Sequence, residues 1–377
     1  MYGYINGIDF HNLAAEKYWT FGKAYKGNAQ EETKKMILSE AYLGSEKIDG
    51  HYARLIKDED GNIILQGRTK SVNGEYLDKH EWVPHLQNFF DWLPNGTCLL
   101  GELYLPKKRG SRNVTTILGC LKDKAIARQE KNEKLCYYIF DVWAWGGESY
   151  LDKEAIERFQ KLDDYAIEFS HLNNYLRLAV YVSGQTLWEA LNIILSVGGE
   201  GIVITKANSK PEPGKRTARK TLKVKAEIQQ TIDAFLDGDY KPPTRLYSGK
   251  EIETWPYWEN PKTGQRYNTC QFASYSTGTS SIEPITKAYY YGWASAVSFS
   301  VMKGGKPIRI AWISGIPDLL KEEIITKPEK WVNKVAELNA MMIECIDGNY
   351  SLRHAKIEQW RDDKAAKDCD FSQISSN

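Results

Sequence analysis

The chain has 377 residues, of which 42% are hydrophobic and 26% charged. These ordinary globular values exclude a collagen-like, disordered or disulfide-scaffold protein. Lys and Arg number 50 against 49 Asp and Glu, so the net charge is +1 and any nucleic-acid-binding surface must be local. The six Cys are far apart and form no CxxC motif, which predicts reduced thiols in a cytosol and no zinc site. The N-terminus lacks leader features, and no apolar run approaches ~18 residues, so no membrane span is expected.

In chain order, the first half predicts a mixed α and β structure. Residues 30–42 have a weak helical pattern. Residues 47–69 have the pattern of a hairpin whose strands, 52–56 and 63–66, flank a turn-forming Asp-Glu-Asp-Gly cluster. Further strands are predicted at 99–105, 137–143, 201–205 and 222–225, and a helix over 187–195 that ends at Gly198-Gly199. Because strands and helices do not alternate regularly, a doubly wound parallel sheet is not expected.

After Glu227 the composition changes, which predicts a second, smaller β-rich domain. Residues 240–300 are crowded with Tyr and Trp and favour an aromatic-rich insertion that packs as a core. A strand is expected at 308–313 and a short helix at 317–325, whereas 332–346 is ambiguous between helix and strand. We therefore expect domains over 1–227 and 228–377, joined near 226–230.

Several charged residues lie on or beside apolar strands, where an unpaired charge is costly. Each has an ordinary explanation as well: a surface ion pair, a carboxylate satisfied by a neighbouring Arg, an edge strand or a solvated charge run. In chain order they are Lys47-x-Asp49-Gly50, Gly101-Glu102-Leu103, Phe140-Asp141-Val142, Glu200-Gly201-Ile202-Val203, Leu222-Lys223-Val224-Lys225 and Arg361-x-Asp363-Lys364. Together they supply two carboxylates for a divalent metal, lysines for phosphates and one candidate nucleophilic lysine, which are the groups that nucleotidyl transfer needs.

This ordered set resembles the covalent nucleotidyltransferase superfamily and, within it, the ATP-dependent DNA ligases of compact bacteriophage or bacterial type. The match runs over most of the chain, from Glu46 to Asp368. The resemblance implies an α+β fold with an antiparallel-β nucleotidyltransferase (adenylation) domain followed by a β-barrel OB domain.

The resemblance also implies roles for individual residues. Lys47 would take AMP from ATP, with Asp49 completing its motif; Glu102 and Glu200 would bind metal; and Phe140 would stack on adenine. Arg361, Asp363 and Lys364 would orient the pyrophosphate, which requires the second domain to close over the first. The expected nucleotide-binding residues are Glu46, Arg54, Arg68, Glu102, Phe140, Arg216, Lys223 and Lys225, the last two also serving in catalysis at the α-phosphate.

Three positions depart from the family pattern. Tyr52 stands where an arginine is common, and Arg54, two residues on, could replace it. Thr205 stands in place of a basic residue, with Lys206 next to it, and Thr221 in place of a Trp. None of these changes removes a group needed for bond making.

The resemblance implies ATP as the nucleotide, Mg²⁺ as the metal with Mn²⁺ as a substitute, and nicked duplex DNA as the substrate of a monomeric cytoplasmic enzyme in a bacterial cell or phage-infected host. Two basic patches adjoin the predicted site strands and would contact phosphates. One comprises Lys206, Lys210, Lys215, Arg216, Arg219, Lys220, Lys223 and Lys225, and the other Lys107, Lys108, Arg109 and Arg112.

An RNA ligase and an mRNA guanylyltransferase of the same superfamily remain as alternatives. RNA ligases commonly lack the C-terminal Arg-x-Asp-Lys motif, whereas capping enzymes share it and use GTP. An NAD-dependent DNA ligase is disfavoured because only 46 residues precede Lys47 and no CxxC exists. A non-catalytic single-strand-binding relic is disfavoured because every charged residue of the set is present.

Overall fold

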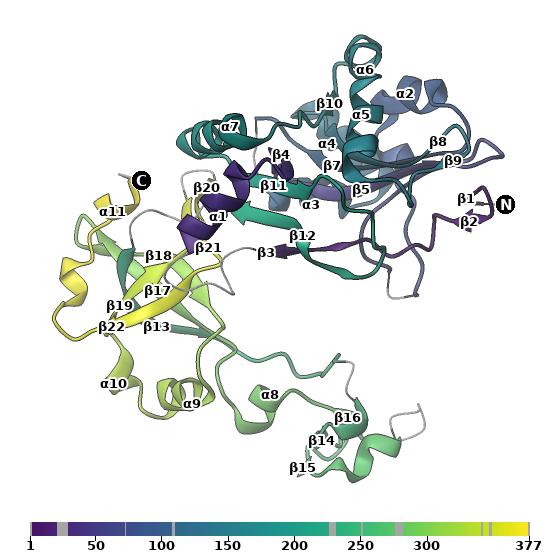
Figure 1. The fold of residues 1–377 in the computed structure, drawn as a ribbon. Coiled ribbons are helices and arrows are strands. Elements are labelled where there is room, and N and C mark those ends of the chain that lie inside the picture. The colour runs from purple at the N-terminus through teal and green to yellow at the C-terminus, as the bar shows by residue number, and fades with distance from the viewer. Residues whose placement is uncertain are drawn as a thin grey trace. The chain divides into compact units, whose positions relative to one another are not determined.

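The computed structural model describes residues 2–20, 29–71, 73–107, 110–225, 231–249, 252–275, 282–340, 342–346 and 349–375. The chain forms two compact units, residues 1–226 and 227–377 (Figure 1). The predicted join at 226–230 lies outside the described residues. Within the described part of the chain, no helix is long and apolar enough to cross a membrane.

The larger sheet of the first unit has six strands in the order β10-β8-β7-β5-β6, with β9 added to β8. All neighbours are antiparallel except β10 and β8. The strands are β5 (His51–Lys57), β6 (Ile63–Gln66), β7 (Thr97–Tyr104), β8 (Cys136–Trp145), β9 (Glu148–Ser149) and β10 (Leu176–Leu178). The predicted hairpin is β5 and β6, and Asp58 organises its turn by accepting hydrogen bonds from the backbone N–H groups of Gly3 and Asn62.

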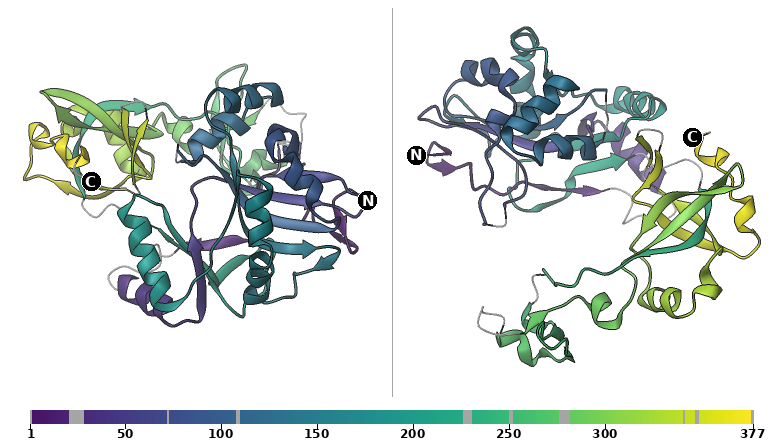
Figure 2. Two further views of the ribbon diagram at one scale, coloured as in Figure 1. Left: turned by 90° about the horizontal axis from the view of Figure 1, so that it is seen from above. Right: turned by 180° about the vertical axis from the view of Figure 1, so that it is seen from behind.

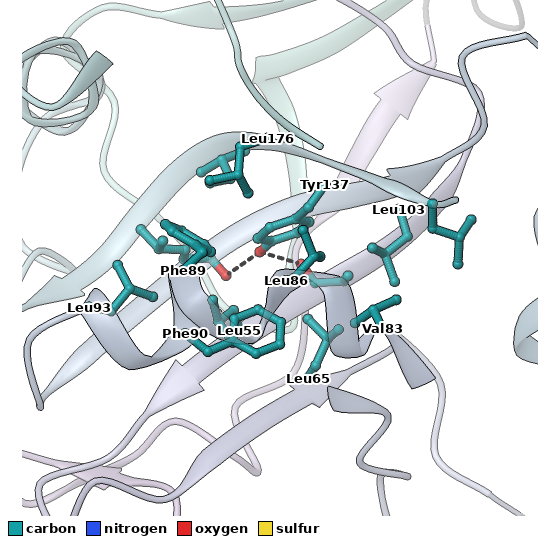
Figure 3. Close-up of a cluster of buried hydrophobic side chains, with 14 of the residues drawn as sticks. Leu55, Leu65, Val83, Leu86, Phe89, Phe90, Leu93, Leu103, Tyr137 and Leu176 are labelled. Carbon is teal, nitrogen blue, oxygen red and sulfur yellow. Dashed lines mark hydrogen bonds between the residues drawn. The ribbon is translucent and has the colours of Figure 1, made fainter. Parts of the chain in front are cut away.

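Helices gather on one side of this sheet (Figures 1 and 2). They are α2 (Gln87–Trp92), α3 (Ser111–Leu118), α4 (Lys122–Lys131), α5 (Ala155–Asp163) and α6 (Ala166–Leu172). The buried side chains between them and the sheet form the main core, part of which is drawn in Figure 3. At its centre the Tyr137 hydroxyl lies 3.2 Å from the Ala53 carbonyl and 3.3 Å from that of Leu99, so this buried polar group is satisfied.

A second sheet of four strands, in the order β3-β12-β11-β4, completes the first unit. Its strands are β3 (Lys17–Thr20), β4 (Tyr42–Glu46), β11 (Gly201–Lys206) and β12 (Arg216–Lys225). The helices α1 (Ala29–Leu38) and α7 (Gly184–Ser196) supply Ile37, Leu187 and Leu191 to the core on this sheet. The first residues form a two-stranded ladder, β1 (Tyr4–Ile5) and β2 (Ile8–Asp9), which sends Ile5 and Phe10 into a core cluster with Trp143.

The second unit is built on an antiparallel sheet in the order β18-β17-β13-β19-β22 (Figure 2). Its strands are β13 (Ile232–Lys241), β17 (Ala296–Lys303), β18 (Lys306–Ile313), β19 (Val335–Asn339) and β22 (Lys356–Arg361), and a separate pair is formed by β20 (Met342–Ile346) and β21 (Asn349–Arg353). The helices are α8 (Lys287–Tyr291), α9 (Asp318–Thr326), α10 (Pro328–Trp331) and α11 (Ser372–Ser375).

Between β13 and β17, the aromatic-rich segment forms its own small sheet around the fully buried Trp258. The sheet pairs β14 (Tyr257–Glu259) with β15 (Arg266–Asn268) and β16 (Glu283–Pro284). Stacked rings such as Tyr247 on Trp255, with centroids 3.6 Å apart, pack within it. The segment therefore packs as an aromatic core, as its composition predicts.

One expectation needs correction. The helix predicted over 30–42 ends at Leu38, because Glu40 adopts a left-handed φ of 58° and Tyr42 already begins a strand. The polar first residues, which carry no strand pattern, nevertheless contribute three short strands. The ambiguous segment 332–346 resolves into strands β19 and β20, with residue 341 between them outside the described residues.

Candidate active site

Lys47 stands immediately after β4, at the end where this strand pairs with the beginning of β11. Glu46 lies opposite Ile202 in that ladder, and the Lys47 N–H donates to the Gly201 carbonyl at 2.8 Å. Gly50 follows in the turn into β5, where an added Cβ would come within 2.4 Å of the Leu103 carbonyl oxygen. The turn can therefore press against β7 only because residue 50 has no side chain.

The Lys47 ammonium is held by Glu200, a buried carboxylate that bridges two lysines. Lys47 Nζ lies 2.6 Å from Glu200 Oε2, and Lys225 Nζ lies 3.0 Å from Glu200 Oε1. The Glu200 side chain is only 3% exposed, so these charge-assisted contacts satisfy it in place of water. Gly201, at φ 130° with its ideal Cβ 2.1 Å from the Val224 carbonyl, lets β11 begin directly after this carboxylate.

Glu102 and Lys223 face the same space from the two sheets. Glu102 lies opposite Tyr52 on β7, and Lys223 lies opposite Val203 on β12. Burial raises the pKa of Glu102 to about 7. The positive charge of Lys47 nearby lowers this pKa but does not cancel the effect of burial. Burial also lowers the pKa of Lys223 to about 8, assisted by the positive charges of Lys47 and Arg68. Two oppositely charged groups with strongly shifted pKa values are typical of a functional site.

These side chains line one end of a cavity between the two sheets. The complete lining is Glu16, Tyr18, Ser45, Glu46, Lys47, Ile48, Tyr52, Arg68, Glu102, Tyr138, Phe140, Asp141, Arg158, Phe159, Tyr181, Val203, Thr205, Thr221 and Lys223. Strand register gives the cavity a direction. Lys223 lies opposite Val203, and two residues further along both strands Thr221 lies opposite Thr205. The cationic end is thus at Lys47 and Lys223, and the opposite end lies beyond the two threonines.

Aromatic rings form the walls between these ends. Phe140 and Tyr52 lie with ring centroids 6.4 Å apart, and the Arg68 guanidinium lies 4.9 Å over the Tyr52 ring. Lys223 Nζ lies 5.9 Å from the centre of the Tyr18 ring. Flat apolar walls with a few cations at one end suit a ligand that has a planar base and a phosphate chain.

Several residues of the first unit that the sequence singled out lie outside this lining. Glu200 and Lys225 belong to the site through the carboxylate that contacts Lys47, whereas the others lie elsewhere. Arg54 is 1% exposed and donates two hydrogen bonds of 2.7 Å, to the carbonyls of Phe10 and Leu13. It therefore fastens the N-terminal segment to β5 and also donates to the Tyr52 hydroxyl at 3.4 Å, whereas Arg68 is the cation that lies over the Tyr52 ring in the cavity lining. Arg216 and Lys206 lie exposed on β12 and β11. Asp49 lies in the turn between β4 and β5, outside the lining.

The C-terminal motif is organised within the second unit. Arg361, at the end of β22, donates to both carboxylate oxygens of Asp363 at 2.8 and 2.7 Å, and its Nη1 lies 3.4 Å from Asp233 Oδ1. Lys364 donates to the other oxygen of Asp233. The contact with Arg361 lowers the pKa of Asp363 to about 2. Asp233, on β13, thus holds both cations of the motif.

Three features of these sites were missed from the sequence. Glu16 precedes β3 in a polar stretch that carries no pattern. Asp141 and Arg158 form a buried ion pair in the cavity wall, with 2.8 Å between Nε and Oδ1. Asp141 is a charged residue inside an apolar strand, and this pattern could have marked it as part of the site. Arg158 lies in a helix of mixed polarity, where one more charged residue gives no such indication. Asp233 carries the same pattern as Asp141 at the start of β13.

A groove with basic residues lies on the surface of the first unit. Its lining is Tyr42, Leu151, Asp152, Lys206, Asn208, Ser209, Lys210, Pro211, Glu212, Arg219 and Lys220. Four members of the first predicted basic patch therefore share one groove. In the second patch, Lys108 and Arg109 lie outside the described residues.

Comparison with known proteins gives a single family. The family model described as ATP dependent DNA ligase domain matches residues 23–225, more than half of the chain. A DNA ligase of Saccharolobus islandicus is 20% identical over 347 residues, which cover 85% of this chain and 52% of that protein. A DNA ligase of Saccharolobus solfataricus is 21% identical with the same coverage. The chain thus spans about half the length of the curated relatives that it matches.

Solved structures show the same fold. One named "Pmar-Lig_Pre." has a TM-score of 0.58 at 16% identity and covers 93% of this chain and 68% of its own. Another, from "DNA binding with a minimal scaffold: Structure-function analysis of Lig E DNA ligases", has a TM-score of 0.54 at 14% identity and covers 92% of this chain and 99% of its own. The family model, the curated relatives and the order of the charged motifs agree, and the chain belongs to the ATP-dependent DNA ligase domain family.

Proposed function

We propose that this protein is an ATP-dependent DNA ligase that seals nicks between a 5′-phosphate and a 3′-hydroxyl in duplex DNA through a lysyl-AMP intermediate. The observation that carries the proposal is the position of Lys47: a lysine amine at the end of an aromatic-walled cavity, with a buried carboxylate at 2.6 Å and two further cations, Lys223 and Arg68, in the lining. An amine there faces the phosphates of a nucleotide whose base lies between the aromatic walls.

In the first step, the Lys47 amine attacks the α-phosphorus of ATP. A phosphorus–nitrogen bond forms, the bond from phosphorus to the bridging oxygen breaks, and pyrophosphate leaves. The amine must lose its proton first, and Glu200 Oε2 is the acceptor in contact with it. Lys223 and Arg68 offset the negative charge that develops on the phosphate oxygens. An arginine could not replace Lys47, since it does not deprotonate in proteins.

The carboxylates of Glu102 and Glu200 would hold a divalent cation such as Mg²⁺ or Mn²⁺, for which Glu200 would give up a contact with Lys47 or Lys225. Both carboxylates are hard oxygen donors, and the raised pKa of Glu102 shows a desolvated carboxyl that a cation would favour as carboxylate. Among the described residues, no hydrogen-bond donor contacts Glu102, so its oxygens are available. A bound cation would supply charge neutralisation at the phosphates.

In the second and third steps, AMP passes from Lys47 to the 5′-phosphate of the nick, and the 3′-hydroxyl then displaces AMP. The duplex must bind through its phosphates, and the groove containing Lys206, Lys210, Arg219 and Lys220 supplies a local positive surface that the net charge of +1 does not. We infer that the protein acts as a monomer on this substrate.

The second unit is proposed to be an OB domain. Its support is the antiparallel sheet of five strands, with irregular register in three of its ladders, as strongly bent small barrels require. Arg361 and Lys364, held by Asp233 and Asp363, are proposed to orient the pyrophosphate in the first step.

The direct test is incubation of the purified chain with ATP and Mg²⁺, followed by mass spectrometry of the intact protein. A gain of one AMP is expected, together with sealing of a 5′-phosphorylated nick in duplex DNA that weakens steeply as salt rises. Labelling by GTP and not ATP would assign a guanylyltransferase, and sealing confined to RNA nicks would assign an RNA ligase. Absence of any adduct would refute the proposal.

A further inference from the structure

The far end of the active-site cavity contains a carboxyl group that the family motifs do not include. Glu16 lies directly before β3 and is 7% exposed. Its Oε1 accepts a hydrogen bond of 2.5 Å from the Glu212 backbone N–H, and the N–H of the next residue, Lys17, donates to the Lys215 carbonyl at 3.0 Å. Two backbone contacts thus fix Glu16 in place against the loop before β12.

The direction of the cavity determines which part of a nucleotide Glu16 would meet. The cations Lys47 and Lys223 mark the phosphate end. Away from Lys223, strand β12 leads back through Thr221 to Thr217, which lies opposite Tyr18 on β3. Glu16 precedes Tyr18 by two residues and so lies still further from the two cations. A nucleotide with its phosphates at Lys47 therefore extends its base toward Glu16.

Of the charged groups at this end, Glu16 alone has an oxygen free for a ligand among the described residues. Both oxygens of Asp141 are taken by Arg158, at 2.8 and 3.2 Å, and Oδ1 also accepts from the Val142 N–H. Arg158 in turn donates to the carbonyls of Lys153 and Ser209. Glu16 Oε2 accepts no hydrogen bond from a described residue, so this oxygen is available to a ligand in the cavity.

We propose, on the basis of the function proposed above, that Glu16 selects adenine over guanine by accepting a hydrogen bond from the exocyclic 6-amino group of the base. Guanine carries a carbonyl oxygen at the same position. That oxygen would face the carboxylate oxygen, so two acceptors would meet in a desolvated space and neither would gain a hydrogen bond.

The protonation of Glu16 gives the selection a pH dependence. Burial raises the pKa of Glu16 to about 7, with Asp141 and Glu212 raising it further and Arg158 and the Glu212 N–H lowering it. Tyr18, the tyrosine of β3 in the cavity lining, stays neutral because burial raises its pKa well above the ordinary value of 10. Below pH 7 the neutral carboxyl can donate to the guanine oxygen. The preference for adenine should therefore weaken as pH falls from 8 to 6.

The test compares Glu16→Gln with the full-length wild-type chain by measuring the rate of covalent adduct formation from ATP and from GTP at pH 8. A glutamine keeps the shape but can rotate to donate to the guanine oxygen. The ATP-to-GTP rate ratio should fall about 10- to 100-fold, the range expected for a hydrogen bond to a charged group. The pH dependence of the ratio should also disappear.

Glu81→Gln is the matched control. Its side chain pairs with Lys122 at the surface, 2.9 Å away, and lines neither the cavity nor the basic groove, so the ratio should stay at the wild-type value. An unchanged ratio in Glu16→Gln that still forms the AMP adduct would overturn the inference. If wild-type chain forms no adduct, the proposed function fails, and equilibrium binding of ATP and GTP to the same two proteins still decides whether Glu16 selects the base.

Discussion

At the scale of single residues, the clearest prediction concerns the amine of Lys47. Lys47→Arg keeps the positive charge beside Glu200, and therefore the ion pair and the fold, but removes a group that can deprotonate. We expect no AMP adduct from this variant and a melting temperature close to that of wild type. The measurement is intact mass after incubation with ATP and Mg²⁺.

The matched control is Lys122→Arg, since Lys122 pairs with Glu81 on the surface with 43% of its side chain exposed. It should form the adduct at the wild-type rate. An adduct on another lysine of Lys47→Arg would show that the nucleophile is misassigned.

Lys223 should contribute to activity while lowering stability. Its pKa in the folded chain is about 8, below the unfolded value of ~10.4, so below pH 8 folding must bury a charge that the unfolded chain keeps in water. Lys223→Met should then increase the free energy of unfolding at pH 7 by roughly 1–3 kcal/mol, while adduct formation is lost.

The sign of this effect can be checked against pH. Between pH 8 and 10.4 the unfolded state binds more protons at this site than the folded state, so wild-type stability gains from Lys223 as pH rises. The advantage of Lys223→Met should therefore shrink from pH 8 to pH 10 in denaturant titrations. An advantage that grows over this range would contradict the shifted pKa.

Charged residues on apolar strands were the predictable part of the site. Glu102, Glu200 and the two lysines of β12 stand out because charge is costly there, and the structure brings Lys47, Glu102, Glu200 and Lys223 together. Arg54 gives the same sequence signal but binds backbone carbonyls. Glu16 gives none, because its role depends on a contact with Glu212, 196 positions away, that local sequence does not encode.

At the scale of elements, one buried ion pair joins helix α5 to strand β8. Arg158 and Asp141 have side chains only 3% and 4% exposed, and their contact is bidentate. Removing one partner leaves the other charge buried without compensation. Asp141→Leu alone should therefore lower the free energy of unfolding by about 3–5 kcal/mol.

The double variant Asp141→Leu/Arg158→Met tests the cause. It removes both charges and keeps apolar volume, so most of the lost stability should return, as measured by urea unfolding. If the double variant is as unstable as the sum of the two single variants, the loss comes from packing and not from an unpaired charge.

The predictability of each element followed from the strength of its local pattern. Strands β5 to β8 have strong apolar runs, and the sequence predicts their ends to within about two residues. Definitions of where a secondary-structure element ends differ by about the same amount. The helices α2 to α6 are 6–10 residues long and were not predicted, because most of their stability comes from packing on the core that Figure 3 shows. Helix α1 was predicted too long, since Glu40 ends it by a backbone conformation that glutamate rarely adopts.

At the scale of the whole molecule, the two units should contribute to different steps of the reaction. The groups proposed for bond making at phosphorus, Lys47, Glu200 and Lys223, all belong to the first unit. The second unit contains Arg361 and Lys364, two cations whose proposed ligand is pyrophosphate. Pyrophosphate leaves in the first step, so these cations should matter for that step alone.

Arg361→Ala should therefore fail to form the AMP adduct yet seal a nick that already carries 5′-AMP, whereas Glu200→Ala should fail in both assays. Asp233→Asn should behave like a milder Arg361→Ala, since Asp233 contacts both cations and holds them in position. The assays are intact mass with ATP and sealing of a pre-adenylylated nick, each run on the full chain.

Because Asp233 belongs to the second unit and not to the proposed bond-making site, loss of sealing in Asp233→Asn would mean that the second unit also acts after pyrophosphate has left. Wild-type adduct formation by Arg361→Ala would instead show that the C-terminal motif has no part in the first step.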